Sequence, residues 1–378
     1  MITTRSAVLW ADGEPWRIEE IELDSPRSTD VLVRIEAAGM CHSDDHGRTG
    51  DMPMPLPVIG GHEGAGVVEE VGSDVAGLRA GDHVAMSFIP SCGRCPWCST
   101  GRQYLCDTGA KLFDLGVMSD GRLAHHLIRD GERTPVGRYA QLGTFSERVL
   151  CDQTSLVKVP EDIPFEAAAL VSCGVATGVG SVTERAGTKA GDVVAVVGVG
   201  GIGINAVQGA RLAGASAVIA IDPVAFKRDQ AKLFGASHTF SSIDEAIPAV
   251  GELTDGTMCE RVILSAGVVH GDMVDPCLTL TAKGGTLVVT GVAPLLEDDA
   301  KLNLMMLAML NKEIKGTIFG SLNPREAIPR LLRMYRDGIL QLDELVTRRY
   351  SLDDINVGYD DMLDGRNLRG ILEPARHG

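Results

Sequence analysis

Four cysteines between residues 92 and 106 constrain the architecture of this 378-residue chain more than any other feature. They are spaced Cys-x2-Cys-x2-Cys-x7-Cys, at Cys92, Cys95, Cys98 and Cys106. Four thiolates this close in sequence can surround one tetrahedral Zn²⁺ and leave no position open for a substrate. We therefore predict a structural zinc lobe at about residues 90–107. Disulfides are the alternative, and the intracellular character of the chain disfavours them.

The charge balance restricts the partners of the protein. The chain has 51 acidic and 35 basic residues and a formal net charge of -16, which disfavours nucleic acid and anionic membranes. The N-terminus has no apolar stretch followed by a cleavage site, and we see no apolar run long enough to span a bilayer. We expect a cytoplasmic protein with no nucleic-acid or membrane partner.

The predicted secondary-structure pattern of the chain changes at about residue 175. The first part predicts short strands separated by turns, at residues 7–10, 31–37, 64–71, 83–88 and 145–150. The later part alternates apolar runs at 193–198, 217–221, 261–264 and 286–290 with helical segments, among them 225–234. Alternating strands and helices predict an α/β, doubly wound parallel sheet. We also predict a helix at 329–336, with its proline in the first turn.

A glycine-rich turn follows the first apolar run of the later part. It reads Gly198-Val-Gly-Gly-Ile-Gly203, so the fingerprint comprises Gly198, Gly200, Gly201, Ile202 and Gly203. Glycines here allow a tight turn, close approach of a pyrophosphate and helix–strand packing. The next strand ends in Asp222, whose carboxylate suits ribose hydroxyls and repels a 2′-phosphate, so NAD is favoured over NADP. The alternative is an ordinary glycine turn with Asp222 as a helix cap.

Three further residues could form a second, reactive metal site. Cys41, His62 and Cys173 would make a Cys2His set, which leaves a fourth zinc position for water or alcohol. Their spacing alone does not join them. Each taken singly is typical of a buried core residue.

The ordered combination of motifs closely resembles the zinc-dependent medium-chain alcohol dehydrogenases. It comprises Gly61-His-Glu-x2-Gly-x-Val68, the four cysteines, Cys173-Gly-x3-Gly178 and the glycine fingerprint, and extends to Lys315–Gly320 and Gly358–Ile371. Within that family the chain is most similar to the actinobacterial nicotinoprotein alcohol dehydrogenases. These hold NAD(H) through turnover and are assayed with N,N-dimethyl-4-nitrosoaniline. Residues 88–93, 142–145 and 222–228 carry the closer likeness.

The resemblance implies a domain organisation. We expect a GroES-like, mostly β catalytic domain at residues 1–174, a Rossmann NAD-binding domain at 175–319, and a return to the catalytic domain at 320–378. Because relatives associate through the coenzyme domain, we also expect a homo-oligomer.

The resemblance assigns roles around the reactive metal. Cys41, His62 and Cys173 would ligate the catalytic zinc, and Glu63 would lie behind the metal. Asp44 would hydrogen-bond the far nitrogen of His62 and fix its tautomer. The alternatives are a surface carboxylate for Glu63 and a simple turn residue for Asp44.

The resemblance also implies a proton relay. Ser43 would take the proton of the alcohol, and His46 would pass it onward through the nicotinamide ribose to solvent. A hydroxyl suits this role because it both donates and accepts, and a histidine because it titrates near neutral pH. The alternatives are a helix N-cap for Ser43 and an exposed helical histidine for His46.

Three residues are carried over as coenzyme contacts. His42 occupies the place where many relatives use arginine against the pyrophosphate, and its partial charge weakens that role. Arg369 matches a C-terminal phosphate-contacting arginine, and Lys227 would lie near the adenosine ribose. A solvated surface charge is the alternative for both basic residues.

Other polar and sulfur residues receive no active role. We interpret His125 and His126 as surface residues, and Cys151, Cys259 and Cys277 as small apolar groups. Phe88 and Leu142 could line the alcohol pocket or pack in the core. Residues 107–143 form a long polar excursion that could cover the cleft.

The function implied is reversible hydride transfer between a primary alcohol and NAD(H), with two zinc ions per chain. Tightly held NADH would be reoxidised by a second substrate or an electron-acceptor partner. One alternative is an ordinary NAD-exchanging alcohol or thiol-adduct formaldehyde dehydrogenase. A non-catalytic dinucleotide-binding redox sensor is the alternative from a different class.

Overall fold

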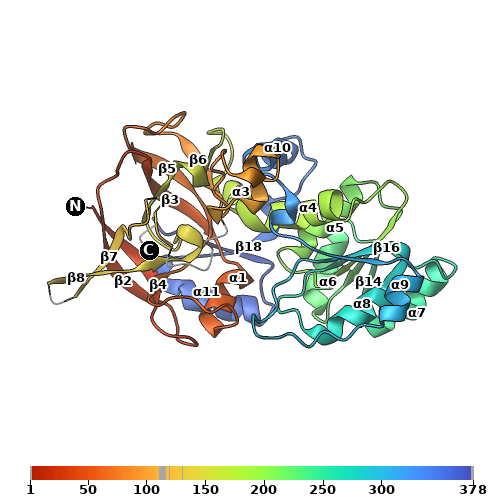
Figure 1. The fold of residues 1–378 in the computed structure, drawn as a ribbon. Helices are drawn as coiled ribbons and strands as arrows, with labels where there is room; N and C mark the ends of the chain where they lie inside the picture. The colour runs from red at the N-terminus through yellow and green to blue at the C-terminus, as the bar shows by residue number, and fades with distance from the viewer. Residues whose placement is uncertain (1, 110–115, 119, 130, 376–378) are drawn as a thin grey trace. The chain divides into compact units, whose positions relative to one another are not determined.

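The computed structural model describes residues 2–109, 116–118, 120–129 and 131–375 (Figure 1). The chain divides into two compact units. The first comprises Met1–Cys173 and Asn323–Gly378, and the second comprises Gly174–Leu322. The chain therefore leaves the first unit once and returns to it.

The first unit is built on two sheets. One has the strand order β8-β7-β2-β1-β4-β9 and the other β11-β6-β5-β3-β19-β18, with β10 also paired to β3. The strands are β1 (Ile2–Leu9), β2 (Arg17–Leu23), β3 (Asp30–Gly39), β4 (Val58–Ile59), β5 (Glu63–Val71), β6 (His83–Met86), β7 (His125–Arg129), β8 (Glu132–Pro135), β9 (Gly137–Arg138), β10 (Arg148–Asp152), β11 (Leu156–Lys158), β18 (Val346–Tyr350) and β19 (Arg369–Leu372). The predicted strand-rich first part is confirmed.

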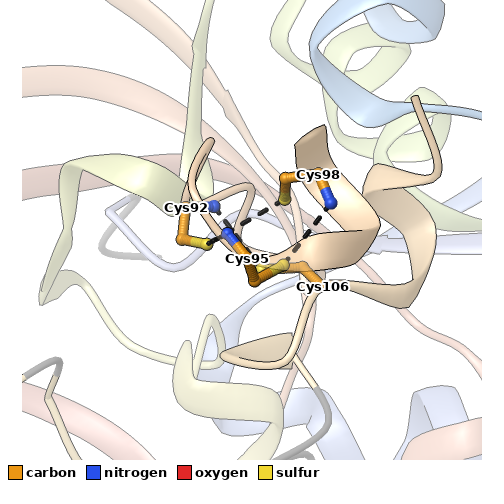
Figure 2. Close-up of side chains that lie close together, drawn as sticks. All are labelled: Cys92, Cys95, Cys98 and Cys106. Carbon is orange, nitrogen blue, oxygen red and sulfur yellow. Dashed lines mark hydrogen bonds between the residues drawn. The ribbon is translucent and has the colours of Figure 1, made fainter. Parts of the chain in front are cut away.

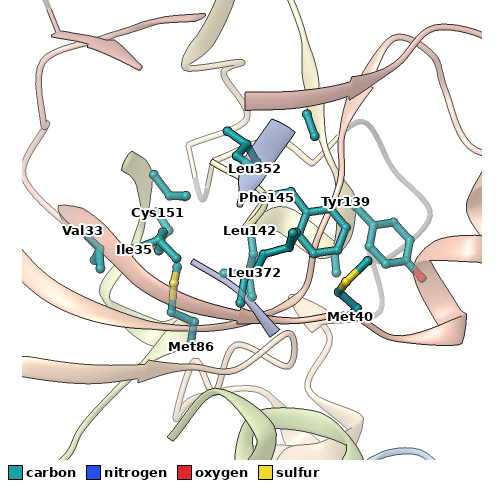
Figure 3. Close-up of a cluster of buried hydrophobic side chains, with 14 of the residues drawn as sticks. Val33, Ile35, Met40, Met86, Tyr139, Leu142, Phe145, Cys151, Leu352 and Leu372 are labelled. Carbon is teal, nitrogen blue, oxygen red and sulfur yellow. The ribbon is translucent and has the colours of Figure 1, made fainter. Parts of the chain in front are cut away.

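Strand β3 organises this unit. It pairs antiparallel with β5, β10 and β19, and Val31, Val33 and Ile35 are fully buried. β-branched side chains pack well on such a pleated surface. They belong to a large apolar cluster that also contains Phe145 and Leu142 (Figure 3). Cys151 lies in the same cluster, as its interpretation as a small apolar group predicted.

Five α-helices belong to the first unit among the residues described. They are α1 (His42–Thr49), α2 (Pro96–Ser99), α3 (Phe165–Leu170), α10 (Pro324–Arg336) and α11 (Ile355–Leu363). The prediction for residues 329–336 places the helix start wrongly, because α10 begins at Pro324 and Pro329 lies inside it. The proline of the first turn is Pro324, the position where the missing N–H costs nothing.

Asn323 connects α10 to the cysteine lobe. It stands at the N-cap of α10 but makes no side-chain cap hydrogen bond there. Its Oδ1 instead accepts from the Gln103 amide, and its Nδ2 donates to the Gly101 carbonyl, both at 2.8 Å. The residue with which the chain re-enters this unit thus binds the backbone next to Cys98 and Cys106.

The second unit is a parallel sheet with the strand order β14-β13-β12-β15-β16-β17. This is the doubly wound dinucleotide-binding order 3-2-1-4-5-6, so the predicted Rossmann fold is confirmed. The strands are β12 (Val193–Val197), β13 (Ala217–Ile221), β14 (His238–Phe240), β15 (Cys259–Leu264), β16 (Thr281–Val289) and β17 (Glu313–Gly316). The helices are α4 (Ala176–Gly180), α5 (Gly203–Leu212), α6 (Ala225–Leu233), α7 (Ile243–Leu253), α8 (Val274–Leu280) and α9 (Leu304–Met309). Cys259 and Cys277 are buried in its apolar cluster, as predicted.

Two glycines meet where the chain enters and leaves the second unit. A Cβ added to Gly180 would lie 2.5 Å from the Gly320 carbonyl oxygen. Conversely, a Cβ on Gly320, which has φ +64, would lie 2.6 Å from the Ala176 carbonyl oxygen. Helix α4 and the turn Phe319–Ser321 therefore pass each other at backbone contact, which requires glycine.

One helical segment corrects the expectation that no apolar run of the chain is long enough to span a bilayer. Phe165–Arg185 is long and apolar enough to cross a bilayer by length and hydropathy, and 89% of the scored window is buried inside the structure. Among the described residues it is the one helix that passes this test. A mostly buried window is what a core helix presents, so the segment is weak support for a membrane span.

Candidate active site

The four cysteines of the lobe converge (Figure 2). Their sulfur atoms all lie within 4.8 Å of one another. Backbone amides point at them: the Cys95 amide donates to Cys92 Sγ and the Cys98 amide to Cys95 Sγ, both at 3.4 Å. Burial opposes ionisation of Cys92, but the amides of Arg94 and Cys95 lower the pKa of its thiol to about 6. A group of sulfurs surrounded by amide donors fits a tetrahedral zinc.

A second group assembles from distant parts of the first unit. Ligand atoms of Cys41, His62, Glu63 and Cys173 lie within 4.8 Å of one another, and all four residues are buried. Cys41 is the N-cap residue of α1, His62 directly precedes β5, and Cys173 lies in the π-helical turn Val171–Val175. His62 Nε2 lies 3.3 Å from Cys173 Sγ. The structure thus brings together the three residues that spacing alone could not join.

Asp44 orients His62. The Asp44 Oδ1 lies 3.1 Å from His62 Nδ1 and also accepts from the Gly61 amide at 3.0 Å. Burial opposes the charged imidazole, but the Asp44 carboxylate raises the pKa of His62 well above its ordinary value. Nε2 is therefore the ring nitrogen that faces the sulfur atoms. Asp44 lies in α1 and is buried, so its interpretation as a turn residue is wrong.

The two thiols of this group differ. A hydrogen bond from Cys173 is the largest cause that lowers the pKa of Cys41, and His62 lowers it further. The same hydrogen bond, together with burial, raises the pKa of Cys173. The hydrogen bond from Cys173 and the nearby His62 therefore favour the thiolate form of Cys41. Two thiolates and an imidazole make a donor set that fits zinc with one position open.

Glu63 forms a buried ion pair with Arg369 behind this group. Arg369 Nη2 contacts Glu63 Oε2, and both side chains are at most 3% exposed. A Cβ on Gly39 would lie 1.9 Å from that carboxylate oxygen, so the position requires glycine. The alternatives of a surface carboxylate for Glu63 and a solvated surface charge for Arg369 are therefore wrong. Arg369 Nε has no hydrogen-bond partner within the described part of the chain, so the guanidinium retains a donor for a further ligand.

The predicted relay residues lie in α1. Ser43 is the second residue of that helix, and the N-cap is Cys41, so the N-cap interpretation of Ser43 is wrong. Its Oγ accepts from the Cys41 thiol at 3.6 Å. His46 is only 1% exposed, which excludes an exposed helical histidine. His42 is partly exposed, with its ring centroid 5.1 Å from that of His46.

Two residues near this site were missed by sequence reasoning. The Tyr139 hydroxyl donates to the Ser43 carbonyl at 2.9 Å, and its ring lies edge-on to His62. Asp51 Oδ2 lies 3.0 Å from His46 Nδ1. No spacing signal marks either residue. Phe88 also packs its ring against His62, whereas Leu142 is fully buried in the core cluster.

The glycine fingerprint forms the turn between β12 and α5. Gly198 has φ +84, and a Cβ on Gly203 would lie 1.9 Å from the Gly198 carbonyl oxygen. A Cβ on Gly200 would meet nothing within 4 Å, so the backbone is open to a ligand there. Gly201 and Ile202 are partly exposed at the start of α5. These features fit a phosphate group at a helix N-terminus.

Asp222 follows β13 with its carboxylate held in place. Its Oδ2 accepts from the Val199 amide at 3.0 Å and its Oδ1 from the Val224 amide at 2.9 Å. The carboxylate thus bridges the fingerprint and the loop before α6. Lys227 lies in α6 and is partly exposed.

The adjacent histidines do not lie where we expected them. His125 and His126 belong to β7 and are 1% and 8% exposed, so the interpretation as surface residues is wrong. Burial lowers the pKa of His125 well below its ordinary value. Neither is part of a metal-binding group within the described ranges. Part of the excursion at 107–143, residues 110–115, 119 and 130, lies outside the described residues.

Two known families match separate parts of the chain. Residues 27–161 match the alcohol dehydrogenase GroES-like domain, and residues 201–337 match the zinc-binding dehydrogenase family.

Individual relatives extend over nearly the whole chain. The NDMA-dependent alcohol dehydrogenase of Amycolatopsis methanolica is 50% identical, covering 98% of both chains. The S-(hydroxymethyl)glutathione dehydrogenase of Paracoccus denitrificans is 34% identical, covering 98% of this chain and 99% of its own. A crystal structure of an alcohol dehydrogenase zinc-binding domain protein from Burkholderia ambifaria superposes with a TM-score of 0.91 at 33% identity over 100% of both chains.

Proposed function

Because this chain belongs to the zinc-dependent medium-chain alcohol dehydrogenases, we propose that it transfers hydride reversibly between a primary alcohol and NAD(H). Family membership implies zinc, an NAD-type cofactor and a small alcohol or aldehyde substrate. The finer proposal rests on one observation, the convergence of Cys41, His62 and Cys173 in a buried group with an adjacent hydroxyl.

We assign the metal ligands as follows. Cys41, His62 and Cys173 would hold the catalytic zinc, and the four cysteines of the lobe would hold the structural one. The catalytic ion, when bound, supplies a Lewis acid that lowers the pKa of an alcohol, and NAD supplies the hydride acceptor.

The remaining residues orient and move protons. Asp44 fixes His62 with Nε2 toward the metal side, and Tyr139 holds the backbone of Ser43. Ser43 Oγ accepts the proton of the alcohol as it gives up its own hydroxyl proton, and His46 passes one proton on toward solvent. Glu63 and Arg369 balance the charge behind the ligands. Glu63 would also assist ligand exchange. Arg369, whose Nε has no hydrogen-bond partner in the described part of the chain, would contact a coenzyme phosphate.

The coenzyme contacts follow the same family pattern. In our proposal, residues 175–319 form the NAD domain and residues 1–174 and 320–378 the catalytic domain. The turn Gly198–Gly203 would receive the pyrophosphate, Asp222 and Lys227 the adenosine ribose, and His42 the pyrophosphate.

We further propose that NAD(H) stays bound and is reoxidised by a second substrate or an electron-acceptor partner. The 50% identity to an NDMA-dependent enzyme supports this mode over a thiol-adduct formaldehyde dehydrogenase, whose relative is 34% identical. The buried ligand group argues against a non-catalytic sensor, because a sensor needs no open metal position.

Native mass spectrometry of the purified protein tests these points together. We expect two zinc ions and one NAD(H) per chain, with NADH absorbance that survives desalting. If the purified protein contains no nucleotide and is active with added NAD, the proposal that NAD(H) stays bound is refuted. If the protein holds a single zinc ion, and this ion is lost in Cys92→Ser but kept in Cys41→Ser, the assignment of a catalytic metal site is refuted.

A homo-oligomer and a cytoplasmic location complete the proposal. Helix α9 exposes Leu304, Met305 and Met309 at 68–74%, and β17 stands at the end of its sheet. Exposed apolar side chains and an edge strand each favour association with a second copy. Light scattering of wild type and of Met305→Glu measures the oligomer, which the charge should weaken.

A further inference from the structure

The buried His46 is connected to water by a carboxylate that no motif predicts. Helix α1 ends at Thr49, and its C-cap is Gly50, whose φ of 83 turns the chain back toward the last helical turn. Asp51 Oδ2 then lies 3.0 Å from His46 Nδ1, and the Met52 amide donates to the His46 carbonyl at 3.0 Å. The His46 side chain is 1% exposed and that of Asp51 is 28% exposed. The carboxylate therefore stands between a buried imidazole and solvent.

Two further groups keep this carboxylate in place and ionised. The Thr49 hydroxyl donates to the same Oδ2 at 2.9 Å. Burial opposes ionisation, but hydrogen bonds from His46 and Thr49 lower the pKa of Asp51, and His42 adds to this. The other charged groups near this turn are Asp45 and Arg48, which pair with each other, and Asp12, which faces Gly50 from the segment after β1. Asp51 is thus an anion that accepts the Nδ1 proton of His46.

We propose that Asp51 positions His46 for proton transfer and is the outlet of the relay. The pair fixes the tautomer in which Nδ1 carries the proton and Nε2 accepts. When His46 takes a proton at Nε2, it releases the Nδ1 proton to Asp51, and Asp51 gives it to water. One proton enters the ring and one leaves, so the charge of His46 is unchanged. The reverse reaction returns a proton by the same route and restores the first tautomer.

This inference rests on the proposed function, since it adds an outlet to its relay. The main test is Asp51→Asn in the holoenzyme, because asparagine can still accept from Nδ1 but cannot carry the proton. We expect single-turnover formation of bound NADH to slow about a hundredfold near pH 6.5, at the low end of what a proton-transfer group contributes. The rate should recover as pH rises and on addition of a small base such as imidazole. KM should change little.

Matched variants separate proton transfer from structure. Asp51→Glu should restore part of the rate, because it retains a carboxylate. Asp12→Asn removes a neighbouring charge that faces Gly50 and should behave as wild type. In a double-mutant cycle, Asp51→Asn should add little to His46→Gln, because both act on one step.

The outcomes are distinguishable. Wild type that forms no NADH with any primary alcohol would refute the proposed function itself. An active wild type with an unchanged Asp51→Asn profile would overturn the outlet. So would a rate lowered equally at every pH and not rescued by imidazole, since that pattern reports a structural role alone.

Discussion

The two groups of sulfur ligands in the first unit are assembled in opposite ways. The lobe takes all four cysteines from residues 92–106, and backbone amides of the same loop donate to its sulfurs. The buried group takes Cys41, His62 and Cys173 from three separate elements and surrounds them with side-chain charges. The lobe takes all of its ligands from one loop, whereas the buried group exists only once the sheets and the helical turn that carries Cys173 are in place.

The difference extends to electrostatics. In the lobe, neutral amide dipoles lower the pKa of Cys92. In the buried group, Asp44 acts through His62, and Glu63 pairs with Arg369. Amide dipoles suit an ion that stays in place. Full charges behind the ligands suit a site whose net charge changes when a substrate ionises.

The largest expected effect separates chemistry from folding. Cys41→Ser should lower hydride transfer roughly a thousandfold or more, because the Lewis acid is worth several kcal/mol. Metal analysis should give one zinc per chain in place of two, and circular dichroism should stay as in wild type. A variant that keeps both zinc ions and full activity would contradict the assignment of Cys41.

Cys92→Ser should have the reverse profile. Loss of one thiolate should weaken zinc binding in the lobe by several kcal/mol, since ligand number sets structural zinc affinity. We expect proteolytic cleavage within 92–106 and a lower unfolding temperature. Molecules that remain folded should keep their rate of hydride transfer. A stable protein with slower hydride transfer would reverse the roles of the two groups.

Glu63→Gln examines the charge behind the buried group. It leaves the buried Arg369 without its anion, which we expect to destabilise the protein by about 3 kcal/mol. Urea unfolding of the metal-free protein measures this. Glu166→Gln is the matched control, because its partner Arg349 is half exposed and such a pair contributes about 1 kcal/mol or less. Equal effects of the two changes would be inconsistent with a buried ion pair.

Asn323→Ala should give the smallest effect. It removes two hydrogen bonds to the lobe, at a cost of about 1–2 kcal/mol. Zinc release to a chelator should become faster in the lobe and stay unchanged in the buried group. Asn323→Asp keeps one acceptor and should lie between alanine and wild type. Equal acceleration of zinc release from both groups would show that they are not independent.

The same contrast explains what the sequence could predict. The lobe and the glycine fingerprint are local, so spacing identifies them. The group around Cys41, His62 and Cys173 was readable only through the family resemblance, because sheet pairing brings it together. Asp51 and Tyr139 were missed since single polar residues in turns give no pattern.

Errors in secondary structure have similar causes. The sequence does not predict that His125 and His126 are buried, because two histidines in a polar stretch do not indicate a buried strand. Pro329 was assigned to a first turn, although the actual first-turn proline is five residues earlier. Buried apolar runs such as β13 were located correctly, because a parallel sheet covers both faces of a strand.

The contact between Gly180 and Gly320 has a practical consequence. The stretch between them forms a compact unit that the chain enters and leaves through one narrow backbone junction. A segment with adjacent ends can be excised or exchanged without stretching the remaining chain. Residues 174–322 could therefore be replaced as one block by the nucleotide unit of a relative, provided that the relative has glycine at the positions of Gly180 and Gly320.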